Sequence, residues 1–298
     1  MEIDIVYSVK DPVGVSASKL LVEHLRASPS TCPGAKECYR YEGGLIAGYE
    51  QELLDLEILD VSPRSEVRPL IALSRHASRE CRGTLSVHHV GNPTSLTNGG
   101  KPFELGVSYP ALAKALIFYY FKLSQELKLD STYEVTLEAT HHGPTGSKKP
   151  LVFIEVGSCE EQWRDMKAIL ALALTVSNVV NKLEEGLPNC MSATAFGGPH
   201  YPKRYTKAML ESDICFGHII SRHQLVEVIR EDVIEQALER TYPEPSRFIV
   251  IGKKDLSKNF RGGLRESDLE KESYCKVLVA GRGFEPRSRG LSAATPRP

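Results

Sequence analysis

Several features that would narrow the class of this protein at once are missing from its 298 residues. No run of about 18 apolar residues occurs, so the sequence predicts no transmembrane helix. Neither sign of charge dominates, because 37 Lys and Arg residues face 38 Asp and Glu residues. This balance excludes binding of nucleic acid through overall positive charge, although it leaves room for a local basic patch. The first residues, MEIDIVYSVKD, contain acids and no basic segment, so we expect no secretory signal there.

The sequence also lacks the cysteine spacing of a zinc or disulfide scaffold. Seven cysteines are scattered along the chain, and none forms a Cys-x-x-Cys pair. An odd number without such spacing favours a reducing compartment with buried or idle thiols. The composition is otherwise that of an ordinary globular protein, with 41% hydrophobic and 25% charged residues. We therefore predict a cytoplasmic, globular monomer that does not associate with a membrane.

Short apolar runs that alternate with longer helical patterns indicate the fold class. The strands are predicted at residues 3–7, 69–73, 84–87, 133–139, 151–156, 192–196 and 248–251. The long helices are predicted at residues 109–127, 160–183 and 225–238. An earlier helix carries Leu20, Leu21 and Leu25 on one face, with Ser16 or Ser18 as its cap. Strands that alternate with helices imply crossover connections, so we expect an α/β fold with a mostly parallel or mixed sheet.

We predict one catalytic domain over residues 1–280, followed by a tail over residues 281–298. The tail reads GRGFEPRSRGLSAATPRP and holds four arginines, three prolines and one glutamate. Such a composition cannot bury a core, so we expect a basic, disordered and solvated tail.

The nine histidines are unevenly distributed along the chain. Six of them follow an apolar run: His76, His88, His89, His141, His142 and His200. In open α/β sheets ligands bind at the carboxyl ends of the strands, so we expect these side chains to meet in one crevice. The same crevice is within reach of His218, Glu138 and Glu155.

The two glutamates carry the strongest chemical signal. Glu155 interrupts the apolar run LVFIEVG, where a charged carboxylate is unfavourable unless it is paired, hydrogen-bonded or bound to a metal. Glu138 lies in TYEVTLEATHH, which alternates like a strand and therefore differs from a metalloprotease helix. Imidazole and carboxylate groups at strand ends suit zinc. The alternative for Glu155 is a capping or ion-pairing role at the end of its strand.

Other polar positions predict contacts with a substrate. Ser74, Arg75 and His76 end a strand, and the Arg75 guanidinium could clamp a phosphate or carboxylate. Asn92 follows a glycine in a turn where backbone N–H groups can approach a ligand. Lysines and arginines after the histidine motifs, Lys203 among them, form either a tRNA contact or a solvated face. The motifs of serine hydrolases, P-loop proteins and nicotinamide enzymes do not occur between the predicted strands and helices.

Six motifs taken together resemble the archaeal and plant type of D-aminoacyl-tRNA deacylase. They are SRHAS (74–78), SVHHVGN (86–92), EATHHGPT (138–145), FIEVGSCEEQW (153–163), GGPHYPKRYTKAML (197–210) and FGHI (216–219). Their order and spacing match across residues 1–255. The resemblance implies a three-layer α/β/α sandwich similar to phosphorylases and peptidyl-tRNA hydrolases. It also implies a zinc-dependent hydrolase that cleaves the ester between a D-amino acid and tRNA.

The family's histidines can be placed on this chain motif by motif. The histidine before the GN turn falls on His88, which leaves His89 as a variable neighbour. The paired histidines of EATHHGP fall on His141 and His142, and the histidine of FGHI falls on His218. The histidine of the glycine-rich turn falls on His200, which follows Pro199 where the family pattern has a third glycine.

From these positions we predict the working parts of the site. His88, His141 and His142 are the expected ligands of one or two Zn²⁺ ions, with Glu138 or Glu155 as ligand or general base. We expect His200 and Arg75 to stabilise the oxyanion or position the terminal adenosine. The expected substrate contacts are Ser74, His76, Asn92, His218 and Lys203. The alternatives are a metal-dependent peptidase or amidohydrolase on a related α/β sandwich, and a nucleoside- or RNA-binding protein without catalysis.

Overall fold

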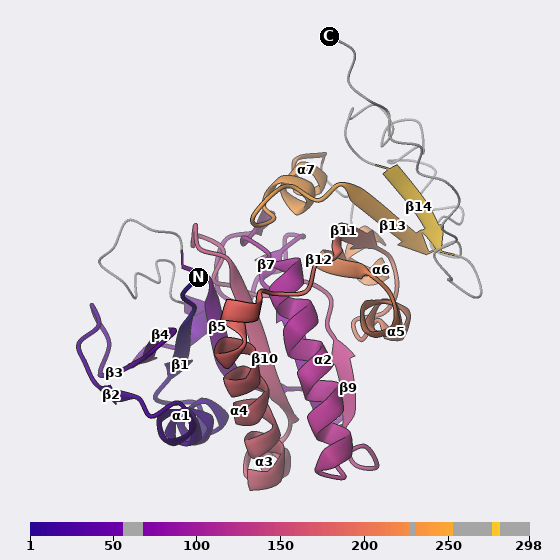
Figure 1. The fold of residues 1–298 in the computed structure, drawn as a ribbon. Helices are drawn as coiled ribbons and strands as arrows, with labels where there is room; N and C mark the ends of the chain where they lie inside the picture. Colours follow the sequence, from indigo (N-terminus) through magenta and orange to yellow (C-terminus); the bar gives the residue numbers. More distant parts are fainter. Residues whose placement is uncertain (56–67, 227–230, 253–275, 281–298) are drawn as a thin grey trace.

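The computed structural model describes residues 1–55, 68–226, 231–252 and 276–280, and Figure 1 shows their arrangement. Within these residues the chain forms an eight-stranded sheet, a four-stranded sheet and a two-stranded pair, with helices packed against them. The predicted α/β class is therefore confirmed. The proposed likeness to phosphorylases and peptidyl-tRNA hydrolases stays a prediction.

The large sheet has the strand order β2-β3-β4-β1-β5-β10-β6-β9. Its strands are β1 (Asp4–Ser8), β2 (Ser28–Pro29), β3 (Glu37–Tyr41), β4 (Gly44–Tyr49), β5 (Leu70–Ala77), β6 (Thr84–His89), β9 (Glu134–Leu137) and β10 (Leu151–Ser158). The smaller sheet is parallel and has the order β12-β11-β13-β14. The remaining strands are β7 (Gly91–Asn92), β8 (Glu104–Leu105), β11 (Met191–Phe196), β12 (Ile214–Ile220), β13 (Phe248–Gly252) and β14 (Lys276–Ala280).

Seven α-helices lie within the described residues. They are α1 (Pro12–His24), α2 (Pro110–Glu126), α3 (Glu160–Trp163), α4 (Met166–Asn181), α5 (Lys203–Glu211), α6 (Arg222–Val226) and α7 (Glu231–Glu239). Two short 3-10 helices occupy Leu53–Asp55 and Leu183–Glu185. Among the described residues, no helix combines the length and the apolar character needed to cross a bilayer.

Strand direction in the large sheet is mixed. β1, β4, β5 and β10 run parallel to their neighbours within that group, whereas β6 runs antiparallel to β10 and β9 follows the direction of β6. The carboxyl ends of β6 and β9 therefore point the opposite way along the sheet from those of β5 and β10. Residues that follow these four strands cannot all meet at the same end of the sheet, so a shared site must lie across one of its faces.

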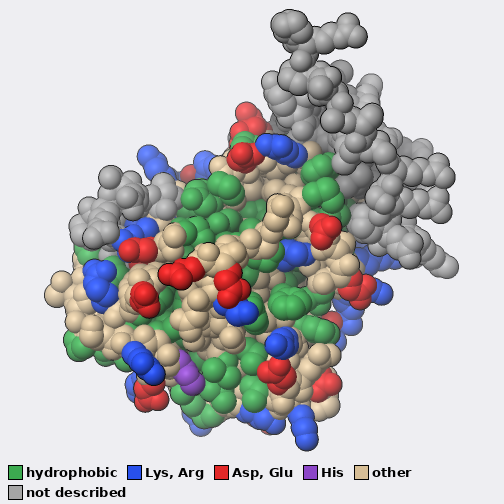
Figure 2. Space-filling view, viewed as in Figure 1, with side chains coloured by type: hydrophobic (Ala, Val, Ile, Leu, Met, Phe, Trp, Pro, Cys, Tyr) green, Lys and Arg blue, Asp and Glu red, His purple; other side chains and the backbone are tan. Residues whose placement is uncertain are grey.

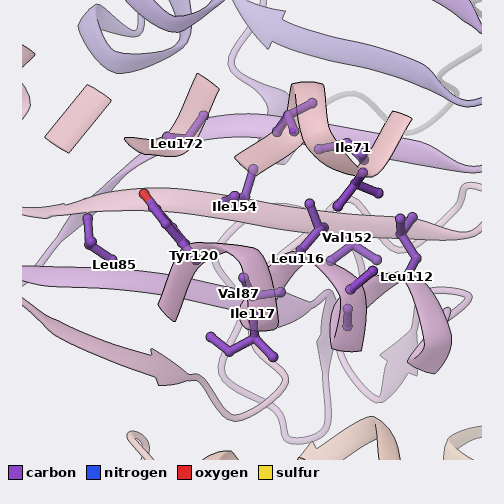
Figure 3. Packing of buried hydrophobic residues seen from close by; sticks show 14 of the residues in the cluster. Ile71, Leu85, Val87, Leu112, Leu116, Ile117, Tyr120, Val152, Ile154 and Leu172 are labelled. Atoms are coloured by element: carbon purple, nitrogen blue, oxygen red, sulfur yellow. The ribbon is translucent and has the colours of Figure 1, made fainter. Parts of the chain in front are cut away.

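One face of the large sheet is apolar and is covered by the three longest helices. Alternate residues of β10, such as Val152, Ile154 and Val156, are buried in a cluster that also contains side chains of α1, α2 and α4. Figure 1 shows these helices side by side in front of the sheet, and Figure 3 shows Leu116 and Tyr120 of α2 close to Ile154. This packing follows from the period-two alternation of a strand and the apolar stripe of each helix.

The smaller sheet joins the same core through α2. Strand β12 packs against α2, and Ala193, Ile214 and Phe216 belong to the cluster that fills the helix-covered face of the large sheet. On the other side of the smaller sheet, α7 packs through Val233 and Ala237. The two sheets therefore share one continuous hydrophobic core within the described residues.

Two local predictions about the helices are wrong. Asp11 caps α1 through Oδ1, which accepts the N–H groups of Val13 and Gly14, while Ser18 lies inside the helix. Asp11 precedes a proline, and proline favours the first helical position, so the helix starts earlier than predicted. The predicted helix 160–183 is also interrupted, because Asp165 starts a second helix by accepting the N–H of Lys167.

The prediction of unpaired thiols is contradicted by the structure. Three disulfides pair Cys32 with Cys38, Cys81 with Cys159, and Cys190 with Cys215. Two of the pairs are 78 and 25 residues apart in the sequence, so no local spacing motif indicates them. The fold brings their Cα atoms to 5.1 and 5.7 Å, within the range that a disulfide can bridge. Because disulfides also occur inside hyperthermophilic cells, the pairing does not assign a compartment, and a cytoplasmic location stays a prediction.

The predicted domain boundary and tail stay predictions. Residues 253–275 and the tail 281–298 lie outside the described residues, as do residues 227–230 of the predicted helix 225–238.

Candidate metal and catalytic centre

The candidate centre lies on the face of the large sheet that the long helices leave free. Glu155 of β10 points to this face, and its neighbours across the sheet are Ser74 of β5 and Ser86 of β6. Because β5 is parallel and β6 antiparallel to β10, His76 pairs two residues beyond Glu155 and His88 two residues before it. The two imidazoles therefore flank the carboxylate. His76 Nδ1 lies 3.2 Å from Glu155 Oε2, and His88 Nε2 lies 3.7 Å from Oε1.

A glycine two residues after Glu155 gives His76 its space. A Cβ atom on Gly157 would lie 2.5 Å from the Cβ of His76 and 2.8 Å from its ring. Any larger residue at this position would therefore displace the imidazole. In the sequence Glu155-Val156-Gly157, the carboxylate and the glycine that leaves room for His76 thus lie on one face of the strand, and the core residue Val156 lies on the other.

A second buried carboxylate connects the remaining histidines. Glu138 follows β9, and its Oε2 accepts a hydrogen bond from His200 Nε2 at 2.8 Å. His141 Nε2 lies 3.7 Å from the same oxygen, and His76 Nδ1 lies 3.3 Å from Oε1. Glu138 and Glu155 are each only 2% exposed. His76 thereby bridges two carboxylates that would otherwise be buried without a counter-charge.

Three imidazoles share a hydrogen-bonding pattern that fixes their tautomer. His88, His141 and His142 each place Nδ1 on a carbonyl oxygen of their own chain segment, at 3.2, 2.8 and 2.6 Å. A carbonyl only accepts, so Nδ1 carries the hydrogen and the lone pair lies on Nε2. Such a carbonyl partner is typical of histidines that bind a metal. Ring centroids 4.3 to 4.8 Å apart keep the three imidazoles in contact.

The charges of the centre follow from this packing. Burial opposes ionisation of Glu138, but the hydrogen bond from His200 and the nearby His76 lower its pKa to about 2. Burial also opposes ionisation of Glu155, yet hydrogen bonding to His76 and the charge of His88 lower its pKa as well. In turn, both carboxylates outweigh the burial of His76 and raise its pKa to about 9. At neutral pH the centre therefore holds two carboxylates and an imidazolium.

The paired histidines behave in the opposite way. Burial, followed by the proximity of His88, lowers the pKa of His142 to about 4, and the same causes lower the pKa of His141. Both imidazoles are therefore neutral and available as ligands at neutral pH. For His88, Glu155 outweighs burial and raises the pKa.

Three overlapping groups within the described residues could hold a metal ion, with ligand atoms within 4.8 Å of one another. They are His88 with His141 and His142, Glu138 with His141 and His200, and His76 with Glu138 and Glu155. His88 Nε2 is buried and makes no hydrogen bond within the described residues. A buried nitrogen lone pair without a hydrogen-bond partner, beside two further imidazoles and a carboxylate, fits a metal ligand.

A pocket of about 200 Å³ opens beside the centre. The pocket is lined by Ser8, Asp11, Glu52, Leu53, Leu54, Ser74, Arg75, His76, Ala77, Asn98, His141, His142, Phe153 and Glu155. Phe153 and Leu53 supply an apolar wall, while the histidines and Glu155 supply the polar one. The pocket can therefore enclose a small organic group next to the candidate metal ligands.

Arg75 lines the pocket, but its guanidinium already forms ion pairs with two carboxylates. Its guanidinium lies 3.5 Å from Asp11 and 3.6 Å from Glu52, and it stacks over Trp163 at 5.6 Å. Ser74 lies beside it and donates its hydroxyl to Asp11 at 3.3 Å. An anionic ligand would have to compete with two carboxylates for Arg75.

Four other positions singled out in the sequence lie away from the pocket. His89 and His218 are 3% and 0% exposed and face each other, with ring centroids 6.0 Å apart. Asn92 donates its amide to the carbonyls of Gly99 and Lys101, so it shapes a loop. Lys203 lies on α5 with its side chain 69% exposed and pairs with Glu134 at 3.1 Å.

Sequence reasoning missed two residues that contact the centre. Tyr201 places its hydroxyl 2.6 Å from His76 Nε2, and Asp11 binds the backbone N–H of Arg75 at 2.9 Å. Tyr201 directly follows His200 in the glycine-rich motif, so its position next to a predicted site residue indicates a place near the centre. Asp11 had a signal too, since an Asp-Pro pair before a helical pattern predicts a helix cap.

Comparison with known proteins assigns the family. A family model described as D-aminoacyl-tRNA deacylase matches residues 64–273. This chain belongs to the D-aminoacyl-tRNA deacylase family. A protein of that name from Aeropyrum pernix is 42% identical over 91% of this chain and 97% of its own length. One from Staphylothermus marinus is 35% identical over 83% of this chain and 88% of its own.

A solved structure supports the fold of this family member. A crystal structure described as a conserved protein of unknown function superimposes with a TM-score of 0.79. The match covers 93% of this chain and 95% of the other, at 24% sequence identity. At this identity the match supports the architecture of the chain and nothing more.

Proposed function

We propose that this chain hydrolyses the ester that joins a D-amino acid to tRNA and releases the free D-amino acid and the tRNA. Membership of the family, and the names of relatives that match over most of their length, support this activity. The observation that carries it is the set of three imidazoles whose Nδ1 atoms are bound to carbonyl oxygens, beside two buried glutamates. This arrangement suits hydrolysis that depends on a bound metal.

Zinc is the ion that this donor set fits best. His88, His141 and His142 would hold it, because each offers an Nε2 lone pair whose orientation is fixed by the Nδ1 hydrogen bond. When bound, Zn²⁺ lowers the pKa of a water ligand to about 7 and polarises a carbonyl. The groups of Glu138 with His141 and His200, and of His76 with both glutamates, leave room for a second ion.

The residues around the ligands supply charge and hydrogen bonds. Glu138 and Glu155 are ionised, so each can accept a hydrogen bond from the attacking water and orient it. His200, with its side chain 38% exposed, stands at the rim and donates to Glu138. We assign the oxyanion to His200 rather than to Arg75 or His76, because each of these two is already paired with two carboxylates.

The tRNA would approach from the side of α5. This helix begins three residues after His200. Its residues Lys203 and Lys207 have side chains that are 69% and 73% exposed. Glu211, the partner of Lys207, is 64% exposed, so a phosphate group can replace it, whereas Glu134, the partner of Lys203, is only 22% exposed. Contacts of this kind would position the acceptor end beside the pocket without reading its sequence.

The proposed function is tested by comparing D-tyrosyl-tRNA with L-tyrosyl-tRNA. The purified protein is measured as isolated, after chelation, and after addition of zinc or, as a control, magnesium. We expect loss of the D ester alone, which stops after chelation and returns with zinc. Activity that is indifferent to chelation would contradict the metal-dependent mechanism. Turnover of amino-acid amides or peptides without deacylation would contradict the substrate and favour a peptidase.

A further inference from the structure

Two of the most deeply buried polar residues of the family motifs, Thr140 and His218, lie outside the pocket and are joined by a hydrogen bond. Thr140 is 1% exposed and His218 is 0% exposed, and neither lines the pocket. His218 belongs to β12 of the smaller sheet, whereas Thr140 directly precedes His141. The Thr140 Oγ1 atom and the His218 Nδ1 atom are 3.2 Å apart.

The direction of this chain of hydrogen bonds follows from its ends. His218 Nε2 lies 3.1 Å from the carbonyl oxygen of Gly106, which can only accept, so Nε2 carries the hydrogen. His218 Nδ1 is therefore the acceptor and the Thr140 hydroxyl is the donor. The same hydroxyl oxygen accepts the N–H of Ile219 at 3.0 Å. The Thr140 hydroxyl is thereby fixed on both sides by β12.

The backbone of Thr140 is held by the same part of the molecule. Its N–H donates to the carbonyl of Ile219 at 2.8 Å, and its carbonyl accepts the side-chain amide of Gln224 at 2.8 Å. Every polar atom of Thr140 is thus bound to β12 or to α6. The smaller sheet, which contributes no residue to the candidate metal ligands, determines where the chain enters the His141-His142 pair.

The orientation of both imidazoles depends on this entry point. His141 donates its Nδ1 hydrogen to the carbonyl of Ala139, whose peptide bond leads into Thr140. On the other side, the N–H of Gly91 binds the carbonyl of His142 at 2.7 Å. The pair is therefore held by the smaller sheet through Thr140 and by the β7–β8 strand pair through Gly91. A shift of Thr140 would turn the His141 ring away from His88.

We propose that Thr140 and His218 are positioning residues that hold His141 and His142 in the orientation in which their Nε2 atoms converge with that of His88. This inference rests on the proposed function for the identity of the metal, but not on the identity of the substrate. It assigns the histidine of the FGHI motif a role behind the site rather than in contact with the substrate.

The experiment removes the Thr140 hydroxyl and measures metal binding separately from activity. Thr140→Val keeps the branched shape, and Thr140→Ser keeps the hydroxyl. The zinc dissociation constant is measured by competition with a chromogenic chelator, and kcat and KM are measured on D-tyrosyl-tRNA. We expect Thr140→Val to weaken zinc binding about 10- to 100-fold and to lower kcat with little change in KM. Thr140→Ser should recover most of both.

The matched control is Thr194→Val. Thr194 is equally buried, and its hydroxyl donates to the carbonyl of Ala237 at 2.8 Å, away from the histidine pair. We expect this variant to lose stability to a similar extent while its zinc affinity and kcat stay at the wild-type level. If Thr140→Val does not fold, His218→Phe removes the same interaction from the other side and should give the same result.

The outcomes separate the inference from the proposed function. Wild-type zinc affinity and kcat in Thr140→Val would overturn the inference, as would an equal loss of affinity in the Thr194 control. A wild-type protein that binds no zinc would also overturn it. A wild-type protein that binds zinc but leaves D-tyrosyl-tRNA intact would contradict the proposed function, while the zinc affinities of the variants would still decide the positioning role.

Discussion

Both faces of the large sheet are buried, but the face opposite the long helices combines the charged centre with a smaller apolar cluster that includes Leu151 and Phe153. Ile154 and Glu155 are neighbours in β10, with exposures of 0% and 2%, yet one packs against helices and the other binds two imidazoles. On the helix-covered face, each buried aliphatic side chain contributes about 1.5–3 kcal/mol. On the other face, burial of ionised groups is unfavourable and is offset only by their mutual pairing.

The comparison shows how a stable core and a reactive centre can share one strand. The apolar face stabilises the sheet without involving the centre, so the other face can hold buried charges that are stabilised by pairing with one another. Figure 2 shows the helix-covered side of the molecule, where acidic and basic side chains are interspersed and histidine is nearly absent. The strand register places His76 and His88 on the other face of the large sheet, together with Glu155. The predictions below test this division from the largest expected effect to the smallest.

The largest effect is expected on the polar face, for His141→Ala. Loss of one ligand should lower deacylation about 10²–10⁴-fold, while the free energy of unfolding changes little because His141 is not part of the apolar core. Activity, zinc content and a urea unfolding curve are measured together. His24→Ala, at an exposed histidine of α1, is the control and should match the wild type. Retained activity with full zinc content would remove His141 from the centre.

The opposite result, a loss of stability with little change in activity, is expected for Ile154→Ala on the helix-covered face of the same strand. Because Ile154 is fully enclosed between α2 and α4, the variant should lose about 2–5 kcal/mol of unfolding free energy. Its kcat, measured well below the melting temperature, should stay close to that of the wild type. A large fall in kcat without a fall in stability would show that the two faces are coupled through the strand.

The smallest effect is expected for Gly157→Ala, which tests the gap beside His76. The added methyl group should cost about 1–3 kcal/mol of stability and lower kcat by displacing His76. Gly48→Ala is the matched control, because its methyl group would collide with Tyr7, a core residue on the opposite face. We expect the control to lose stability and keep its kcat. Equal kcat values in both variants would mean that the position of His76 does not depend on the glycine.

Much of the fold could be predicted because it depends on local patterns. Seven strands coincide with apolar runs recognised in the sequence, among them β1, β5 and β10. β4 was missed because its glycines resemble a loop, although Gly48 is required where the Tyr7 ring occupies the space of a side chain. β12 was missed as a strand because Gly217 interrupts its apolar run. The disulfides could not be predicted, since their spacing in the sequence carries no information about spatial contact.

The candidate site was predicted in composition but not in geometry. Clustering at the ends of apolar runs indicated His76, His88, His141, His142 and His200, and these do meet around the two glutamates. Strand alternation separates His89 from His88, because adjacent residues point to opposite faces. The histidines were expected to meet in one crevice at the carboxyl ends of the strands. Five of them do come together, but across a face of the sheet, because the reversal of β6 is a property of long-range pairing that no local pattern reveals.

The link between Thr140 and β12 also bears on the timing of synthesis. The residues that fix the histidine pair follow it by almost 80 positions, since His218 and Ile219 lie 78 and 79 residues after Thr140. At about 5–20 residues per second, a ribosome needs several seconds to add that stretch. For most of this interval a nascent chain already contains His88, His141 and His142 but not strand β12. In every new molecule the centre is therefore incomplete at first, and it can be completed only when β12 has left the ribosome.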